Sequence, residues 1–441
     1  RTPRTRSSSG VGLRSALPDK CLVIQGKQEP LCSHGDPRYN RSIIIKAGVQ
    51  VQDLVHEIHT TELRSFRGCR RRWHWSFGLD LQPAKTQSVF EFGIAYHVGM
   101  EAMYNPDTWG APRQLIAQFA EAAFYDEAQR QKKAFYALED RGLGDEEERD
   151  YDEQIKLGRG MINWYVMNHV PLKEFVPVYV EQTFQVLITD PDGNQLYCKC
   201  NKCWQKYQNS LLIQHKEGLE TIVVRSGWKG LPVVFEGRVD AIVRDAKGDY
   251  WIVDWKTTIR MMNEDSDVIL ELDDQVAGYV WALRVALGLN IRGFRYIELK
   301  KGFPQPPTKN KVVRLGRSFS ISKNQDTDVQ TFVQTVKQRD NGAYEAGLYD
   351  EYIDWLRQEG PVFLNDHKVY KREAQLRNFG IHLWMQAVEM LSPDLFLYPS
   401  PGRFSCGFCA YREPCLDKDQ GGDYEYALAT SFERKPRYYS L

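Results

Sequence analysis

Residues 235–258 read FEGRVDAIVRDAKGDYWIVDWKTT, and the fold can be worked out from this stretch. Two runs of alternating apolar and polar residues flank DAKGD, whose Gly and Asp residues favour a tight turn. The pattern therefore predicts a β-hairpin. A five-residue loop over 245–249 would place Arg244 opposite Tyr250 and so set the register of both strands.

Two acids and a lysine meet on one face of this hairpin. In the expected register Asp240 faces Asp254, and Lys256 lies on the same face as Asp254 because side chains alternate along a strand. Opposed carboxylates repel each other unless a cation compensates, and Mg²⁺ or Mn²⁺ held by both would do so. The lysine would then orient or deprotonate an attacking water and offset charge at a phosphate. Trp251 and Trp255 place apolar surface on the opposite face, which argues against a merely exposed hairpin.

The rest of the chain surrounds the hairpin with strands and helices. Alternating runs predict further strands over 176–188, 210–215 and 292–299. Helical periodicity covers 55–103, 112–170, 273–288 and 325–395, and 300–324 reads as a Pro-rich loop. The strongly acidic stretch 139–153 predicts a solvated loop or helix face. The outline is an α/β core with helices before and after it.

The motifs of the hairpin resemble the PD-(D/E)XK nuclease signature in its RecB/AddB-like branch. Asp240 is followed by Asp254-Trp255-Lys256 at the spacing of that signature, although Val239 stands where the family has Pro. The resemblance implies a restriction-endonuclease-like fold and metal-dependent DNA hydrolysis. It also implies that Asp240, Asp254 and the Trp255 carbonyl bind the metal and that Lys256 positions the hydrolytic water.

Two helical motifs extend the resemblance. Gln275 and Tyr279 share a helix face at i, i+4 and look like the Gln-x-x-x-Tyr motif of the same branch. Gln275 would orient Lys256 or a phosphate, and Tyr279 would support the site or the DNA. His97, in GIAYH, looks like the branch's helical histidine and would complete the metal site, with Glu101 one turn later to steady it.

A split set of cysteines forms the second strong motif. Cys406, Cys409 and Cys415 follow the spacing Cys-x2-Cys-x5-Cys, which presents several thiolates to one metal centre, and Cys69 is the candidate fourth ligand. The spacing fits zinc equally well. The set is similar to that of iron–sulfur nucleases of the AddB and CRISPR-associated types, and this resemblance implies a 4Fe–4S cluster that joins the helical N- and C-terminal parts.

A second cysteine group, Cys198-x-Cys200-x-x-Cys203 with His215 downstream, is a candidate zinc site that the family pattern does not include. Plain burial or exposure of these cysteines is the alternative reading.

Basic residues offer candidate DNA contacts. Arginine suits phosphates, and tryptophan can stack on the bases of single-stranded DNA. The candidates are Arg70, Arg71, Arg72, Trp73, Lys300, Lys301 and Arg314.

Composition narrows the class of protein. Lys plus Arg and Asp plus Glu both number 58 among 441 residues, so any nucleic-acid surface must be local. We expect a cytoplasmic protein, because no secretory or membrane segment is visible and nine cysteines without a signal argue against a disulfide framework. Without a Gly-x4-Gly-Lys-Ser/Thr loop we expect no ATP hydrolysis, so a helicase or recombination protein would be a separate partner.

We expect a flexible arm over 1–50, a helical region over 51–175, a nuclease core over 176–324 and C-terminal helices with the cysteine motif over 325–441. The function expected is that of a metal-dependent DNA exonuclease acting on ends or single-stranded flaps in repair or recombination. A non-catalytic scaffold that binds DNA ends, and a nuclease that trims spacers in CRISPR adaptation, are the alternatives.

Overall fold

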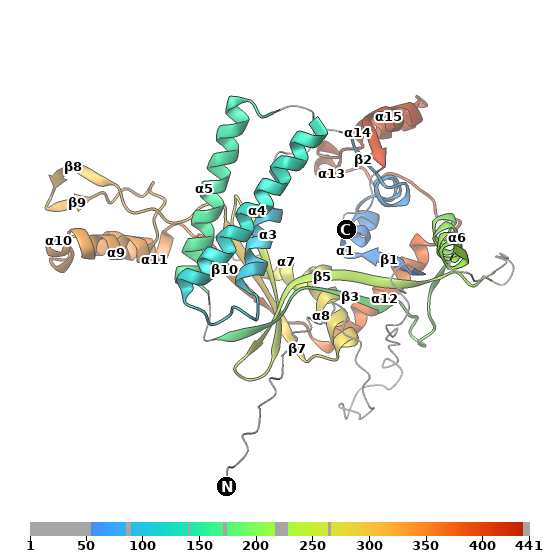
Figure 1. Ribbon diagram of the computed structural model, residues 1–441, viewed down its shortest axis with the longest axis horizontal. Coiled ribbons are helices and arrows are strands. Elements are labelled where there is room, and N and C mark those ends of the chain that lie inside the picture. The colour runs from blue at the N-terminus through green and yellow to red at the C-terminus, as the bar shows by residue number, and fades with distance from the viewer. Residues whose placement is uncertain are drawn as a thin grey trace, which may run out of the picture.

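The computed structural model describes residues 54–84, 90–139, 142–170, 174–216, 228–262 and 266–434. The arm expected over 1–50 lies outside these residues. A central mixed sheet with helices on both faces forms the body of the molecule (Figure 1). The expected α/β class is therefore confirmed.

Within the described residues, seven strands form the central sheet. They are β1 (His56–His59), β3 (Phe175–Leu187), β4 (Tyr197–Cys198), β5 (Leu231–Asp245), β6 (Tyr250–Thr258), β7 (Ile291–Lys300) and β10 (Leu364–Val369). The β5–β6 and β7–β10 pairs are antiparallel, whereas β6 and β7 are parallel. A parallel pair needs a crossover connection, and this one passes through α7 (Ser266–Leu272) and α8 (Asp274–Leu287). Thus β1 and β10 join the sheet from outside the 176–324 range expected for the core.

Strand β5 organises the sheet because it has partners along both edges. β3 and β4 run antiparallel along one edge. The other edge pairs first with β1, over 233–236, and then with β6, over 241–244. Residues 237–240 therefore lie between two successive partners, and Asp240 is at the end of this gap.

Helices cover both faces of the sheet. On one face lie α3 (Phe92–Met103), α4 (Arg113–Glu139) and α5 (Asp145–Asn168), and on the other lie α8 and α12 (Glu373–Met390) (Figure 1). The first layer buries a cluster that includes Tyr96, Phe124 and Trp255. The second buries a cluster that includes Phe235 and Ile252. The two clusters hold the site-bearing strands between them.

An arm extends away from the sheet (Figure 1). It comprises β8 (Lys309–Arg314), β9 (Arg317–Phe319), α9 (Val329–Arg339), α10 (Asn341–Glu345) and α11 (Asp350–Glu359). Phe332 and Tyr349 are fully buried in a small core of its own. The β8–β9 hairpin turns at Leu315 and Gly316, both of which have positive φ.

The two ends of the described chain pack together. The N-terminal partner consists of α1 (Thr60–Gly68), α2 (Arg70–Trp73), η3 (His74–Gly78) and β2 (Leu81–Pro83). The C-terminal partner consists of α13 (Arg403–Gly407), α14 (Arg412–Gln420), α15 (Tyr424–Ser431) and β11 (Phe432–Arg434). β11 pairs with β2, and the Tyr411 hydroxyl donates a hydrogen bond to the Leu81 carbonyl at 2.6 Å. Trp75, Tyr411 and Phe432 share a buried cluster.

Several secondary-structure predictions need correction. The strand expected over 210–215 belongs to α6 (Asn201–Lys216), because a short apolar run does not distinguish the two periods. Helical stretches were expected where the structure places β1 and β10, both of which depend on pairing with strands distant in sequence. The loop expected over 300–324 contains the β8–β9 hairpin.

The acidic stretch over 139–153 mostly enters α5. Four acids, Asp145 to Glu148, occupy its first turn, where negative charge complements the helix dipole. The Glu147 carboxylate also accepts a hydrogen bond from the Gly144 N–H at 2.9 Å. The helix-face alternative is therefore the correct one for this part of the stretch.

Candidate active site

The β5–β6 hairpin has the register expected from its sequence. Arg244 pairs with Tyr250, and the ladder ends at Ala241 opposite Val253. The Asp245 carboxylate fixes the turn by accepting hydrogen bonds from the main-chain N–H groups of residues 247 and 249 and from the Trp251 indole. The next positions beyond the ladder are those of the two predicted aspartates.

Asp240 links the two strands through its side chain. Because the ladder has ended, the Trp255 N–H is available, and it donates to Asp240 Oδ2 at 2.9 Å. His97 on α3 approaches the same oxygen, with its Nδ1 at 3.3 Å. Burial opposes charge on Asp240, but His97, Lys256 and the Trp255 N–H together keep its pKa below the usual value. Asp240 is therefore held as a carboxylate.

The charge on Asp240 acts back on His97. Burial alone would lower the pKa of His97, but the hydrogen bond to Asp240 outweighs it and the pKa is raised. His97 and Glu101 lie one turn apart on α3, beside the residues of that helix that enter the core. The structure thus brings His97 to the first aspartate of the hairpin.

Glu181 on β3 lies beside His97 and Asp240 as a third potential metal ligand. The sequence analysis did not identify it. Ligand atoms of His97, Glu181 and Asp240 all lie within 4.8 Å of one another. Glu181 has φ of 48°, and the β3–β5 ladder resumes on either side of it, at Val180 and Gln182. A glutamate in the left-handed region within a strand is uncommon, and such local strain often accompanies a functional site.

The electrostatic surroundings of Glu181 disfavour its charge. Burial is the main cause, and the neighbouring charges of Asp240 and Glu101 add to it, so that the pKa of Glu181 rises to about 7. Arg238 opposes this shift through an ion pair at 2.7 Å. Two crowded carboxylates with one imidazole form a donor set that fits a divalent ion such as Mn²⁺ or Mg²⁺.

Asp254 and Lys256 form the second half of the site. Asp254 is buried, and Lys256 Nζ lies 2.8 Å from its Oδ2. Burial, assisted by the nearby Asp240, raises the pKa of Asp254 to about 6, although Lys256 opposes the shift. Burial also disfavours the ammonium, but the two aspartates raise the pKa of Lys256 above its usual value. The lysine is therefore protonated at neutral pH.

Helix α8 contributes to the site from the face of the sheet opposite to α3. Gln275 Nε2 donates to Asp254 Oδ1 at 3.4 Å, and Asp273 caps the helix by accepting from the Gln275 N–H at 2.7 Å. Tyr279, one turn later, packs edge-on against Phe184 of β3. A Cβ on Gly237 would lie 3.0 Å from the Tyr279 ring and 2.5 Å from Phe184, so glycine permits this close approach.

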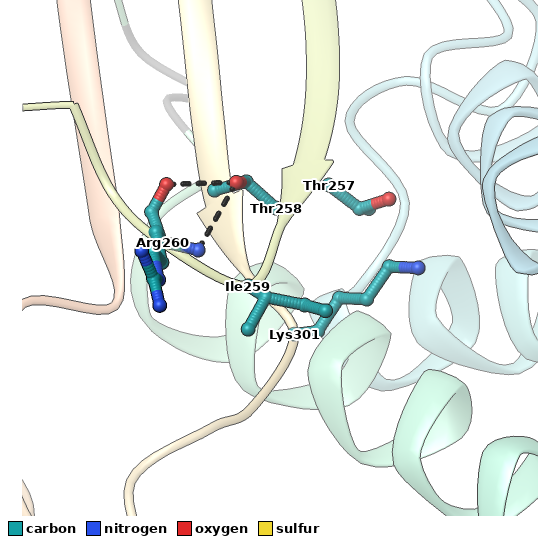
Figure 2. A pocket seen from close by; sticks show the side chains of 5 residues that line it. All are labelled: Thr257, Thr258, Ile259, Arg260 and Lys301. Carbon is teal, nitrogen blue, oxygen red and sulfur yellow. Dashed lines mark hydrogen bonds between the residues drawn. The ribbon is translucent and has the colours of Figure 1, made fainter. Parts of the chain in front are cut away.

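A surface hollow begins directly after Lys256. Its volume is about 590 Å³, and it is lined by Thr257, Thr258, Ile259, Arg260 and Lys301. Figure 2 shows Arg260 and Lys301 on either side of the exposed Ile259, with the Thr258 hydroxyl hydrogen-bonded to the Arg260 main chain. Two cationic side chains thus stand at the end of β6, the strand that carries Asp254 and Lys256.

Three of the candidate DNA contacts in the N-terminal helices have structural partners instead. Trp73 is buried and its indole donates to Glu62 at 3.1 Å, so it is not available to stack on bases, and that prediction is wrong. Arg71 is also buried and donates to Asp419 at 2.7 Å. Arg70 is ion-paired with an acid of α12 and lies over two aromatic rings.

The remaining candidate contacts differ in their availability. Lys300 lies 3.5 Å from Asp326, and Lys301 lies over an aromatic ring at the start of α3. Arg314 is exposed on the β8–β9 hairpin. Contact of Arg314, Lys301 and Arg72 with DNA stays a prediction.

The predicted cluster cysteines lie in the packed chain ends. Cys69 precedes α2, and Cys406 and Cys415 belong to α13 and α14. Arg71 Nη1 donates to Cys415 Sγ at 3.2 Å. Burial and, to a lesser degree, the nearby Asp419 and Cys69 raise the pKa of Cys415, whereas Arg71 opposes the shift. Among the described residues, two groups of potential metal ligands have their ligand atoms within 4.8 Å of one another. Neither group contains the thiol of Cys69, Cys406, Cys409 or Cys415.

The family comparison agrees with this geometry. The model of the PD-(D/E)XK nuclease superfamily, whose nucleases use divalent metal ions, matches residues 60–416. A comparison with curated proteins finds no match. Among the described helices, none is long and apolar enough to cross a membrane. The match covers both aspartates, the lysine and most of the 441 residues, and the chain therefore belongs to the PD-(D/E)XK nuclease superfamily.

Proposed function

We propose that the protein is a metal-dependent deoxyribonuclease that hydrolyses phosphodiester bonds at DNA ends or in single-stranded flaps. The observation that carries the proposal is the convergence of Asp240, Asp254 and Lys256 with His97 and Glu181. Folding alone does not explain this arrangement, because burying carboxylates close together costs free energy. A cationic hollow follows Lys256 at the end of the same strand.

The metal ion would be held by His97, Glu181 and Asp240, with Asp254 and the Trp255 carbonyl completing the set. When bound, a divalent ion supplies Lewis acidity and lowers the pKa of a coordinated water. Protonated Lys256 would hold the attacking water or a phosphate oxygen, and its raised pKa argues against a role as the base. Gln275 would fix the orientation of Asp254, and Tyr279 would support α8 against β3.

The DNA strand would pass over the hollow after β6. Arg260 and Lys301 would meet phosphates there, close to the scissile bond. Arg314 on the arm and Arg72 would add contacts farther from the site. These positions favour an extended strand over a small-molecule substrate.

We also propose a 4Fe–4S cluster bound by Cys69, Cys406, Cys409 and Cys415. What supports the proposal is the meeting of the two chain ends: Cys69 lies near enough to Cys415 to affect its pKa, and Arg71 contacts Cys415. The donors at Cys415 and Cys406, from Arg71 and the Gly402 N–H, suit thiolate ligands.

The test uses end-labelled and covalently closed DNA in parallel. The purified protein should shorten linear DNA with Mg²⁺ or Mn²⁺, leave closed circles intact, and be inactive without a divalent ion. Cleavage of both forms at equal rates would remove the requirement for ends. Binding to linear DNA without cleavage in the presence of either ion would instead support the alternative function, a non-catalytic scaffold that binds DNA ends.

Glu181→Gln should weaken metal binding and stabilise the metal-free protein. We expect Mn²⁺ affinity to fall by at least about 10- to 100-fold, the range seen even for outer-sphere partners. Glu181 has a pKa of about 7 in the folded protein and an ordinary value of 4.5. The folded state thus binds more protons between these values, and stability falls as pH rises from 4.5 to 7. The variant should be more stable without divalent ions above pH 7, by on the order of 1 kcal/mol after allowance for screening.

Glu236→Gln is the matched control for this measurement. Burial also raises the pKa of Glu236, but it lies outside the metal-type group. It should change stability with pH in the same sense without weakening Mn²⁺ binding. Equal Mn²⁺ affinity in Glu181→Gln and the wild type, by calorimetry, would remove Glu181 from the ligand set.

A further inference from the structure

A second group of metal-type ligands lies at the other end of β5. It consists of His56, Cys198, Cys200 and Cys203, whose ligand atoms are all within 4.8 Å of one another. His56 Nδ1 is 3.2 Å from Cys203 Sγ. The sequence had suggested His215 as the histidine, but its side chain lies outside the described residues, and the histidine brought to the three thiols is His56.

Strand pairing explains how four residues so distant in sequence meet. Cys198 on β4 pairs with Leu231 at one edge of β5, and His56 on β1 pairs with Val233 at the other edge. The chain then turns into α6, which places Cys200 just before the helix and Cys203 in its first turn. α6 and β1 lie together near this end of β5 (Figure 1).

The local backbone is shaped around the thiols. Gly230 has φ of 98°, and a Cβ there would lie 2.6 Å from the Cys198 carbonyl oxygen, so only glycine lets the chain enter β5 this close to Cys198. The Cys203 N–H points at Cys200 Sγ, at 3.5 Å. The N-terminus of α6 also favours negative charge, which stabilises thiolates over thiols.

The donor set and its dimensions select one metal ion. We propose that His56, Cys198, Cys200 and Cys203 bind a structural zinc ion that joins β1, β4 and α6. Zinc–sulfur and zinc–nitrogen bonds of about 2.3 and 2.0 Å put tetrahedral ligands about 3.5–3.8 Å apart, which fits the observed grouping. Three thiolates and one imidazole complete four-coordinate zinc and leave no position for a substrate water.

A disulfide accounts for the group less well. It would use two thiols and leave the third beside His56 with no role, in a place where Cys198 and Cys203 are both almost fully buried. Cys200 alone is exposed, so an ion can enter from the surface on its side. Zinc uses all four groups.

The zinc ion would stabilise β1, a short strand that is weakly held to the rest of the sheet. β1 has only four residues, and beyond its pairing with β5 it contacts α6 through the ion pair of Lys206 with Glu57, at 2.7 Å, and through His56 with Cys203. β1 leads directly into α1 and Cys69, so zinc would fix the start of the segment that reaches the chain ends. Asp240 lies nine residues beyond Leu231 on β5, about 30 Å away at strand spacing, so the zinc would not take part in hydrolysis.

The test is metal content, which does not depend on nuclease activity. Protein purified without added zinc should contain about one zinc per chain by mass spectrometry of metals. His56→Ala and Cys200→Ser should each lose most of it, whereas His382→Ala, at an exposed histidine of α12, should keep it. Cys406→Ser should also keep its zinc, which separates this site from the proposed cluster.

Cobalt provides a readout of the ligands themselves, because its spectrum depends on which atoms bind the ion. Co²⁺ bound to the wild type should show the intense ligand-field and thiolate charge-transfer bands of tetrahedral ligation, and Cys200→Ser should lose or shift them. Unchanged zinc content in both site variants would overturn the proposal. So would a disulfide between two of these cysteines in zinc-free, folded wild type that does not take up Zn²⁺ alone.

Discussion

Lys256→Ala is expected to slow DNA cleavage by a factor of at least about 100 to 1,000, the range for losing one preorganised charged or hydrogen-bonding group at a reacting centre. The Lys256 ammonium lies 2.8 Å from Asp254, and the two aspartates keep it protonated. In the proposed mechanism, its contribution would be a fixed positive charge where the phosphate gains negative charge. The measurement is the single-turnover rate on end-labelled DNA at saturating Mn²⁺.

The variant has a second effect that must be distinguished from the first. Without its ammonium partner, buried Asp254 would have a pKa raised further, and protonation of Asp254 would also stop the reaction. If Lys256 acted only through Asp254, raising the pH from about 7 to 9 would restore the rate, because Asp254 would then be ionised. We expect no such recovery.

Lys247→Ala is the matched control, since Lys247 lies exposed in the turn of the same hairpin. It should keep the wild-type rate. Asp254→Asn preserves the size of the side chain and should be as inactive as Lys256→Ala. Retention of more than half the rate by Lys256→Ala, in protein that unfolds at the wild-type temperature, would contradict the assigned role.

The part of the site that the sequence predicted is the local part. The turn and the alternation fix the hairpin register, so Asp240, Asp254 and Lys256 could be placed from one short stretch. Gln275 followed from the resemblance of Gln275-x-x-x-Tyr279 to the family motif, whose two residues share one helix face. In each case the chemistry depends on residues whose relative positions are set by a single element or a single turn.

Glu181 and His56 were beyond the reach of such reasoning. Glu181 looks like an ordinary polar residue of an alternating strand, and its role appears only when β3 is aligned with β5 across a backbone irregularity. A prediction of the pairing register between β3 and β5, which brings Glu181 to Asp240, would have identified Glu181. His56 reaches the three cysteines only because β5 has partners on both edges.

Composition misled where burial was decisive. The Arg-rich stretch around Trp73 resembles a nucleic-acid surface, yet Trp73 and Arg71 are buried, and Arg71 joins the two chain ends. A cluster of positive charge in the sequence does not show which charges face solvent. The cationic residues of the hollow after β6, Arg260 and Lys301, come instead from two separate strand ends.

Cys406→Ser is expected to lose the iron and to lower the melting temperature sharply. A centre bound by Cys69 and Cys406 would close a loop of most of the chain, and covalent closure of even a 100-residue loop stabilises by roughly 4–5 kcal/mol in the chain-entropy model. The contacts that already join the ends, such as Tyr411 with Leu81 and Arg71 with Asp419, would remain and limit the loss. Iron content, the visible spectrum and thermal unfolding under anaerobic conditions measure the effect.

Cys200→Ser serves as the reciprocal control, because it should lose zinc and keep iron. The two variants together assign each metal to its own cysteines, whichever metal is found. Wild type that contains zinc in place of iron, and loses it in Cys406→Ser, would keep the joined ends and replace the cluster by a zinc site. Unchanged metal content and stability in Cys406→Ser would mean that packing of η3, β2 and α14 alone holds the chain ends together, and the proposed centre would then be excluded.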